Sequence, residues 1–243
     1  MTETILILGG TREAAELAAR LVTTRPDARI VSSLAGRTKE PAPVSGEVRT
    51  GGFGGAEGLA NWMRENQVSV VIDATHPFAK TISANAVKAS AISGVPLHRL
   101  ARPAWSRQEG DEWIEVATLA EARDAIPPGA RVFLALGSQH IAPFKERDDI
   151  HFVVRMIDPP GPASDLPDHA LVLGRPGDTP AVEAMLFVAH SVTHIVCRNS
   201  GGDAGYAKIA AARDLGLPVI MIARPGASSP GHATIGELLA ALA

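Results

Sequence analysis

The sequence predicts an α/β fold with mainly parallel β-sheets, divided into two domains. Short apolar runs typical of buried strands alternate along the chain with segments whose apolar residues recur at helical spacing. Polar or glycine-rich turns separate these segments, as they do in successive strand–helix–strand units. A poorly patterned stretch from Ser106 to about Asp111 interrupts the series. We therefore place a domain boundary near residues 100–112 and expect domains at 1–104 and 105–243.

The first domain begins with Ile5–Leu8, a continuous apolar run that suits a strand buried on both faces. The next segment places Ala14, Ala18 and Leu21 near helical spacing, which predicts a helix over 12–22. By the same patterns, further strands are expected at 29–32, 68–72 and 95–100, and further helices at 56–66 and 78–93.

The second domain repeats the alternation. Its expected strands are 113–116, 131–136, 151–156, 170–173, 194–197 and 218–222, and its expected helices are 119–125, 180–190, 206–215 and 235–242. Between two of these strands, Asp158–Pro167 contains four prolines and is expected to be an irregular loop.

Composition excludes several classes of protein. The 243 residues carry a formal net charge of −3, which argues against a nucleic-acid partner. No run of about 18 apolar residues occurs and the start of the chain lacks a basic, apolar leader, so we expect no membrane partner, no signal peptide and a cytoplasmic location. The single cysteine, Cys197, excludes an internal disulfide and is expected to be a buried strand thiol. No metal site is expected: His190 falls at an expected helix end and His194 at a strand start, so the two need not face one way, and no carboxylate or cysteine lies between them.

A glycine-rich turn follows the first strand. Gly9 and Gly10 allow a tight turn that approaches a pyrophosphate, and Thr11 and Arg12 open the next helix, whose free N–H groups favour anions. Alanines stand where a third glycine is usual, so an ordinary strand–helix turn is the alternative.

The end of the second strand carries hydroxyls and cations and no carboxylate. Ser32, Ser33, Arg37 and Lys39 suit a ribose 2′-phosphate, which favours NADP over NAD if a dinucleotide binds. The alternative is a solvated basic loop. The segment Gly51-Gly52-Phe53-Gly54-Gly55 could contact a flat ligand or form a flexible turn.

Two more polar clusters follow strands and should therefore lie at carboxyl edges of the sheets. The first runs from Asp73 to Ala79, and its Thr75 and His76 offer a hydrogen-bond donor and a proton donor; a helix start with an incidental histidine is the alternative. In the second, Asn199, Ser200 and two glycines precede Lys208, which could reach an anionic ligand or be a surface lysine.

These motifs, taken in order, resemble the precorrin-6A reductase family of cobalamin biosynthesis. The matching segments span nearly the whole chain; they are 9–13, 33–37, 51–55, 73–79, 199–202 and 219–225, of which 73–79 is the most diagnostic. The resemblance implies two Rossmann-like domains with an active-site cleft between them. It also implies NADPH-dependent reduction of a ring double bond of precorrin-6A, an anionic tetrapyrrole, to give precorrin-6B.

The resemblance also implies site residues. The expected cofactor-binding residues are Gly9, Gly10, Thr11, Arg12, Ser33, Arg37, Gly52, Phe53, Gly54 and Thr75. Asn199, Ser200, Gly201 and Lys208 are expected to face the substrate from the second domain. The family often has lysine where this chain has Arg198, so the charge is kept while a specific lysine role is not carried over.

A macrocycle with many carboxylates requires cationic partners, for which the candidates are Arg102, Arg198, Lys208 and Arg224. His76 and Lys208 are the candidate catalytic residues. Alternatives are reduction of the cobalt-bearing ring, and a tetrapyrrole- or nucleotide-binding protein without catalysis. A short-chain epimerase or other reductase would need a Tyr-x-x-x-Lys pair, but the only tyrosine, Tyr206, stands two residues before Lys208.

Overall fold

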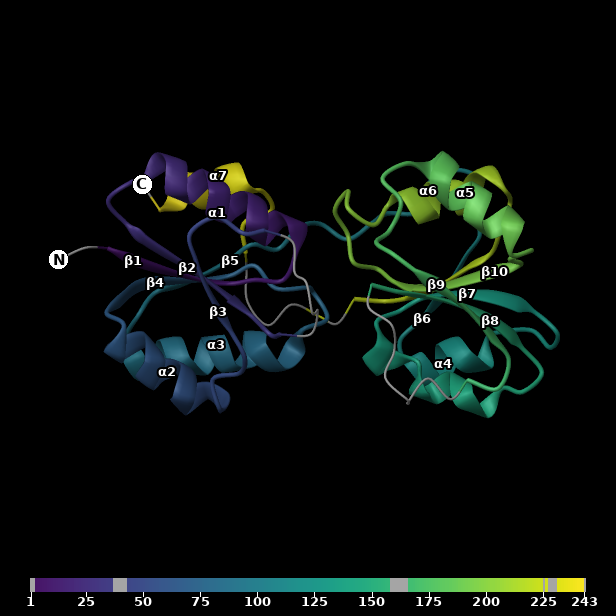
Figure 1. Cartoon of the computed structure of the whole chain (residues 1–243), viewed down its shortest axis with the longest axis horizontal. Helices are drawn as coiled ribbons and strands as arrows, with labels where there is room; N and C mark the ends of the chain where they lie inside the picture. The colour runs from purple at the N-terminus through teal and green to yellow at the C-terminus, as the bar shows by residue number, and fades with distance from the viewer. Residues whose placement is uncertain (1–2, 37–42, 158–165, 225, 227–230, 243) are drawn as a thin grey trace. The chain divides into compact units, whose positions relative to one another are not determined.

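The computed structural model describes residues 3–36, 43–157, 166–224, 226 and 231–242. The chain divides into two compact units. Unit 1 contains the chain up to Pro103 together with the segment from Pro225 onward, and unit 2 is Ala104–Arg224. Each unit is a parallel sheet with helices on both faces, so the predicted α/β class is confirmed (Figure 1).

Unit 1 contains a five-stranded parallel sheet in the order β3-β2-β1-β4-β5. Its strands are β1 (Thr4–Leu8), β2 (Arg29–Leu34), β3 (Glu47–Thr50), β4 (Val68–Asp73) and β5 (Leu97–Arg99). Helices α1 (Arg12–Thr24) and α7 (Ile235–Ala241) cover one face, and α2 (Gly55–Glu65) and α3 (Lys80–Ser93) cover the other (Figure 1).

Alternating residues of β1 build the two core layers of unit 1. Ile5 and Ile7 pack with the apolar side of α1, whereas Leu6 and Leu8 pack with Leu59 and other residues of α2 and α3. Each of these four β1 side chains is at most 1% exposed. Burial on both faces explains why the strand reads as an unbroken apolar run.

Unit 2 contains a six-stranded parallel sheet in the order β6-β11-β10-β7-β8-β9. Its strands are β6 (Trp113–Val116), β7 (Arg131–Ala135), β8 (His151–Met156), β9 (His169–Leu173), β10 (His194–Arg198) and β11 (Val219–Ile222). Helices α5 (Pro180–Ala189) and α6 (Ala207–Asp214) lie on one face and α4 (Leu119–Asp124) on the other (Figure 1).

The end of the chain differs from the predicted division at 104/105. Residues from Pro225 onward belong to unit 1, whereas the sequence pattern assigned everything to residue 243 to the second domain. Leu238 of α7 is fully buried in the core layer that contains Leu17 and Leu21 of α1. A parallel β-bridge between Leu100 and His232 also attaches the segment before α7 to unit 1. The apolar pattern of a short helix does not specify which sheet it covers.

Two histidines join this returning segment to β5. His98 Nδ1 lies 3.3 Å from His232 Nε2, and the rings stack with centroids 5.5 Å apart. Burial lowers the pKa of His98, and the nearby His232 lowers it further. Folding therefore favours the neutral form of His98 relative to the unfolded chain.

This pair predicts a loss of stability in acid. Because the pKa of His98 is lower folded than unfolded, the unfolded chain binds more protons below about pH 6.5, and stability falls as the pH drops through that value. Urea unfolding at pH 7.5 and 5.5 should show a smaller acid loss for His98→Gln than for wild type. His169→Gln, which changes an exposed histidine, is the control. Equal acid losses in all three proteins would contradict the prediction.

Across the described residues, no helix combines the length and apolar character needed to cross a bilayer.

Candidate active site

The strand order of unit 1 reverses between β1 and β4. The chain leaves β1 toward β2 and β3 on one side, and leaves β4 toward β5 on the other. The loops that follow these two strands therefore diverge, and ligands of open parallel sheets bind at such a point. Those loops contain two clusters predicted from the sequence, Gly9–Arg12 and Ala74–Ala79.

The loop after β1 is shaped for close approach of an anion. Gly10 has φ +101°, which strains any residue with a side chain, and no atom lies within 4 Å of the place a Cβ would occupy. Gly9 packs closely, since a Cβ there would lie 3.6 Å from Ala14 and Leu34. The exposed Arg12 begins the 13-residue helix α1, whose free N–H groups attract negative charge.

Thr11 ties the two diverging loops together. Its hydroxyl accepts from the Ala14 N–H at 3.1 Å, which caps α1, and donates to the Ala74 carbonyl after β4 at 2.8 Å. Both roles of the hydroxyl are therefore occupied within the protein. Thr11 shapes the predicted cofactor loop through its side chain.

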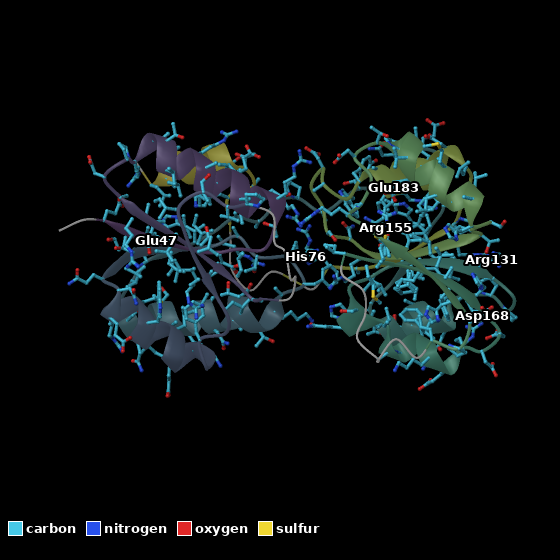
Figure 2. The ribbon with its side chains drawn as sticks, viewed as in Figure 1. Glu47, His76, Arg131, Arg155, Asp168 and Glu183 are labelled. Atoms are coloured by element: carbon cyan, nitrogen blue, oxygen red, sulfur yellow. The ribbon has the colours of Figure 1, made fainter. Side chains whose placement is uncertain are left out.

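The loop after β4 holds Thr75 and His76. Asp73, only 3% exposed, accepts from the Thr75 N–H at 3.1 Å and from its hydroxyl at 2.6 Å. His76, which is labelled in Figure 2, accepts from the Phe78 N–H through Nδ1 at 3.3 Å. A neutral ring with this bond carries its proton on Nε2. Helix α3 begins at Lys80 and not at the predicted residue 78, which leaves this loop longer than expected.

The ends of β2 and β3 contain a cation that sequence reasoning missed. Arg49 of β3 donates through Nη1 to Ser33 Oγ at 2.8 Å, and its guanidinium lies 3.7 Å from the centroid of the Phe53 ring. The register pairs Ser33 with Arg49, which is the signal that could have found it once the strands were aligned. Arg37, the predicted phosphate ligand, and Lys39 lie outside the described residues.

The glycine-rich segment after β3 curves around that cation. Arg49 also donates to the carbonyls of Gly51 and Gly52, at 3.0 and 3.1 Å. A Cβ at Gly52 or Gly54 would meet no atom within 4 Å, so the backbone of this predicted cofactor segment borders open space.

Unit 2 has its own reversal of strand order, between β7 and β10. The loop after β10 contains the predicted residues Asn199, Ser200 and Gly201. The loop after β7 contains Gly137 and the short 3-10 helix Ser138–His140, which the sequence interpretation had not included in the site. The available signal was a glycine two residues after the end of a buried strand.

Trp105 holds the loop after β10. The Asn199 amide accepts from the Trp105 N–H at 2.8 Å and donates to the Trp105 carbonyl at 2.9 Å. The indole Nε1–H donates to the Gly202 carbonyl at 2.7 Å. Gly201 and Gly202 have φ +64° and +68°, so two successive left-handed residues turn the chain here.

Two of the expected substrate-binding side chains support this loop. The Asn199 amide is bonded to Trp105, and Arg224 donates to the carbonyls of Asn199 at 3.4 Å and Ser200 at 2.8 Å. In unit 1, Arg102 pairs with Glu13 at 2.6 Å; burial lowers the pKa of Arg102 and Glu13 opposes that effect. These side chains are engaged with the protein itself.

Lys208 is the second residue of α6 and is half-buried. Its Nζ donates to the Gly205 carbonyl at 2.6 Å and lies 4.9 Å from the Trp105 ring centroid. Burial lowers the pKa of Lys208, against the opposing effects of Cys197 and Glu183. Arg198 ends β10 at the same carboxyl edge.

Cys197 of β10 is fully buried, as expected, and burial raises the pKa of its thiol to about 11. The thiol is therefore inert as a nucleophile at neutral pH.

Among the described residues, no three side chains of the metal-binding types His, Cys, Asp and Glu come together.

The chain is similar to known proteins over its whole length. The family model described as "Precorrin-6x reductase CbiJ/CobK" matches residues 4–243. A precorrin-6A reductase of Rhodococcus erythropolis is 44% identical over 241 residues, covering 98% of this chain and 96% of that protein. The corresponding protein of Rhodobacter capsulatus is 46% identical over 222 residues, covering 91% and 88%. A cobalt-precorrin-6A reductase of Priestia megaterium is 30% identical over 238 residues, covering 91% and 90%.

A solved structure described as "CobK precorrin-6A reductase" has the same fold. Its TM-score is 0.93 at 43% sequence identity, and the match covers 100% of this chain and 96% of that one. Together with the family model and the curated relatives, this likeness confirms the resemblance found in the motifs: the chain belongs to the precorrin-6x reductase family of cobalamin biosynthesis.

Proposed function

We propose that this protein uses NADPH to reduce a ring double bond of precorrin-6A, giving precorrin-6B. The observation that carries the proposal is the reversal of strand order in unit 1, where an open glycine loop and a helix N-terminus stand beside His76. Identity of 44–46% to precorrin-6A reductases, against 30% to a cobalt-precorrin-6A reductase, favours the metal-free ring.

The residues present fit a phosphorylated dinucleotide. Gly10 leaves room for a diphosphate at the start of α1, and Ser33 offers a hydroxyl for a ribose phosphate beside a guanidinium. Gly52, Phe53 and Gly54 would border the same cofactor. The bound cofactor supplies a hydride, and the protein contributes binding, orientation and electrostatics.

A proton must accompany the hydride for the double bond to be saturated. His76 is the proposed donor, because the bond from the Phe78 N–H orients its ring and histidine is the side chain that most often serves as a general acid. In unit 2, Arg198, Ser200, Gly201 and Lys208 are the proposed contacts of the carboxylated ring. Asn199 and Arg224 contribute by holding the loop that presents those groups.

Lys208→Met tests the proposed contact with the substrate. Methionine keeps a long apolar stem against Trp105 and removes the charge, so the fold should persist. We expect kcat/KM for precorrin-6A to fall by about 10- to 100-fold, the effect of losing one hydrogen bond to a charged group. NADPH affinity should be unchanged. Unaltered steady-state kinetics would remove Lys208 from the site.

The function itself is tested with purified protein, NADPH and precorrin-6A. We expect NADPH oxidation in step with a product heavier by two hydrogens. Binding of the ring without NADPH loss would instead identify a non-catalytic tetrapyrrole-binding protein. A parallel assay with cobalt-precorrin-6A distinguishes the substrates, since a higher kcat/KM for the cobalt-bearing ring would contradict the metal-free assignment.

A further inference from the structure

Arg49 and Ser33 form a cluster at the carboxyl ends of two neighbouring strands. The register of β2 and β3 pairs the two residues, and side chains at paired positions of parallel strands project to the same face. The 2.8 Å hydrogen bond between Arg49 Nη1 and Ser33 Oγ is the direct consequence. In nucleotide-binding sheets of this strand order, the residues after the second strand recognise the adenosine ribose.

The charge of Arg49 is not neutralised within the described part of the chain. Its hydrogen-bond acceptors there are a hydroxyl and the carbonyls of Gly51 and Gly52, and no carboxylate of those residues pairs with it. Burial lowers the pKa of Arg49, yet a guanidinium remains protonated at neutral pH. A half-buried cation with only neutral partners favours an incoming anion.

The guanidinium is also held in a fixed orientation. It stacks on Phe53 at 3.7 Å, and Phe53 in turn meets Trp62 edge-on, with ring centroids 5.7 Å apart. Its hydrogen bonds use both Nη1 hydrogens and one Nη2 hydrogen, which leaves Nε and a second Nη2 hydrogen without an acceptor among the described residues. Two such donors can bind an oxyanion with paired bonds.

From this geometry we infer that Arg49, acting with Ser33, binds the 2′-phosphate of the cofactor and sets a preference for NADPH over NADH. The inference rests on the proposed function, because it requires a nicotinamide dinucleotide at this edge of unit 1. The Ser33 hydroxyl accepts from Arg49 and so has its own hydrogen left to donate to a phosphate oxygen.

A purely structural role makes a different prediction. If Arg49 only held the Gly51–Phe53 segment in place, its removal would lower the affinity for ligands with and without the 2′-phosphate to the same extent. If Arg49 recognises the phosphate, its removal would lower the affinity only for the ligand that carries the phosphate. The ratio of the two affinities therefore separates the roles.

The experiment measures binding of adenosine 2′,5′-bisphosphate and of 5′-AMP by calorimetry to wild type, Arg49→Gln and Arg49→Lys. We expect Arg49→Gln to lower the affinity for the bisphosphate by about 10- to 100-fold, the effect of losing a charge-assisted contact. The affinity for 5′-AMP should be nearly unaffected. Arg49→Lys should restore part of the loss because it keeps the charge without the paired geometry. Arg64→Gln, an exposed arginine of α2, is the matched control.

The possible outcomes distinguish a failure of the role of Arg49 from a failure of the proposed function. Unchanged affinities in Arg49→Gln, or equal losses for both ligands, overturn the role of Arg49 while leaving NADPH-dependent reduction in place. If wild type binds neither ligand and does not oxidise NADPH with precorrin-6A, the proposed function fails and the inference fails with it. Catalysis gives a second readout, since Arg49→Gln should lower kcat/KM with NADPH and leave that with NADH nearly unchanged.

Discussion

Glu183→Ala is expected to lower the free energy of unfolding by about 3–5 kcal/mol, because it leaves a buried charge without its partner. Glu183 of α5 is 1% exposed, and its two carboxylate oxygens accept from Arg155 of β8 at 2.7 and 2.6 Å (Figure 2). The Gly177 N–H donates to the same carboxylate at 2.5 Å. Alanine would remove all three bonds and leave the guanidinium over Phe133 without a counter-charge.

Urea denaturation with linear extrapolation measures this effect. Glu47→Ala is the matched control, because Glu47 pairs with Arg29 at 2.8 Å on the exposed surface. This substitution should lower the free energy of unfolding by less than about 1 kcal/mol. The double variant Arg155→Met/Glu183→Leu, which removes both charges, should be more stable than Glu183→Ala. If Glu183→Ala lowers the free energy of unfolding no more than Glu47→Ala does, the buried pair does not have the proposed effect on stability.

His76→Ala is expected to lower kcat by about 100- to 10,000-fold, the usual contribution of a positioned proton donor. The backbone bond from Phe78 orients the ring, and Asp73 holds the adjoining Thr75, so the loop is ordered around the histidine. The side chain of His76 is only partly exposed, and its loss should leave the sheet intact.

Single-turnover reduction of precorrin-6A, with NADPH affinity measured in parallel, tests this role. Affinity for NADPH should stay near the wild-type value while the chemical step slows. Lys80→Ala, an exposed change at the start of α3, controls for local disturbance. Wild-type turnover in His76→Ala would mean that the proton comes from water or from the substrate.

The regular parts of the fold could be predicted because burial dictates their composition. Strand β1 lies at the centre of a parallel sheet, and its Ile5–Leu8 segment reads as an unbroken apolar run. β3 escaped prediction because this edge strand, Glu47–Thr50, is largely exposed and mostly polar. The placement of α7 with unit 1 was missed because a helix of seven residues gives no sign of which sheet it covers.

For the candidate site, the sequence predicted which loops follow the strands, whereas the contacts of individual side chains depend on how the strands and loops pack. Gly10 could be recognised because a tight turn at a helix start has a local signature. Arg49 could not, since its bond to Ser33 depends on the pairing of two strands. Arg224 was expected to contact the substrate because of its charge, and its bonds to two backbone carbonyls of the loop after β10 could not be read from the sequence.

A crystal structure of the protein with NADP⁺ tests the central claim most directly. We expect the diphosphate to lie against the backbone of Gly9–Thr11 at the start of α1, with the 2′-phosphate in contact with Ser33. A dinucleotide bound instead at the loops after β7 and β10 of unit 2, or one whose adenosine phosphate lies away from Ser33, would contradict it.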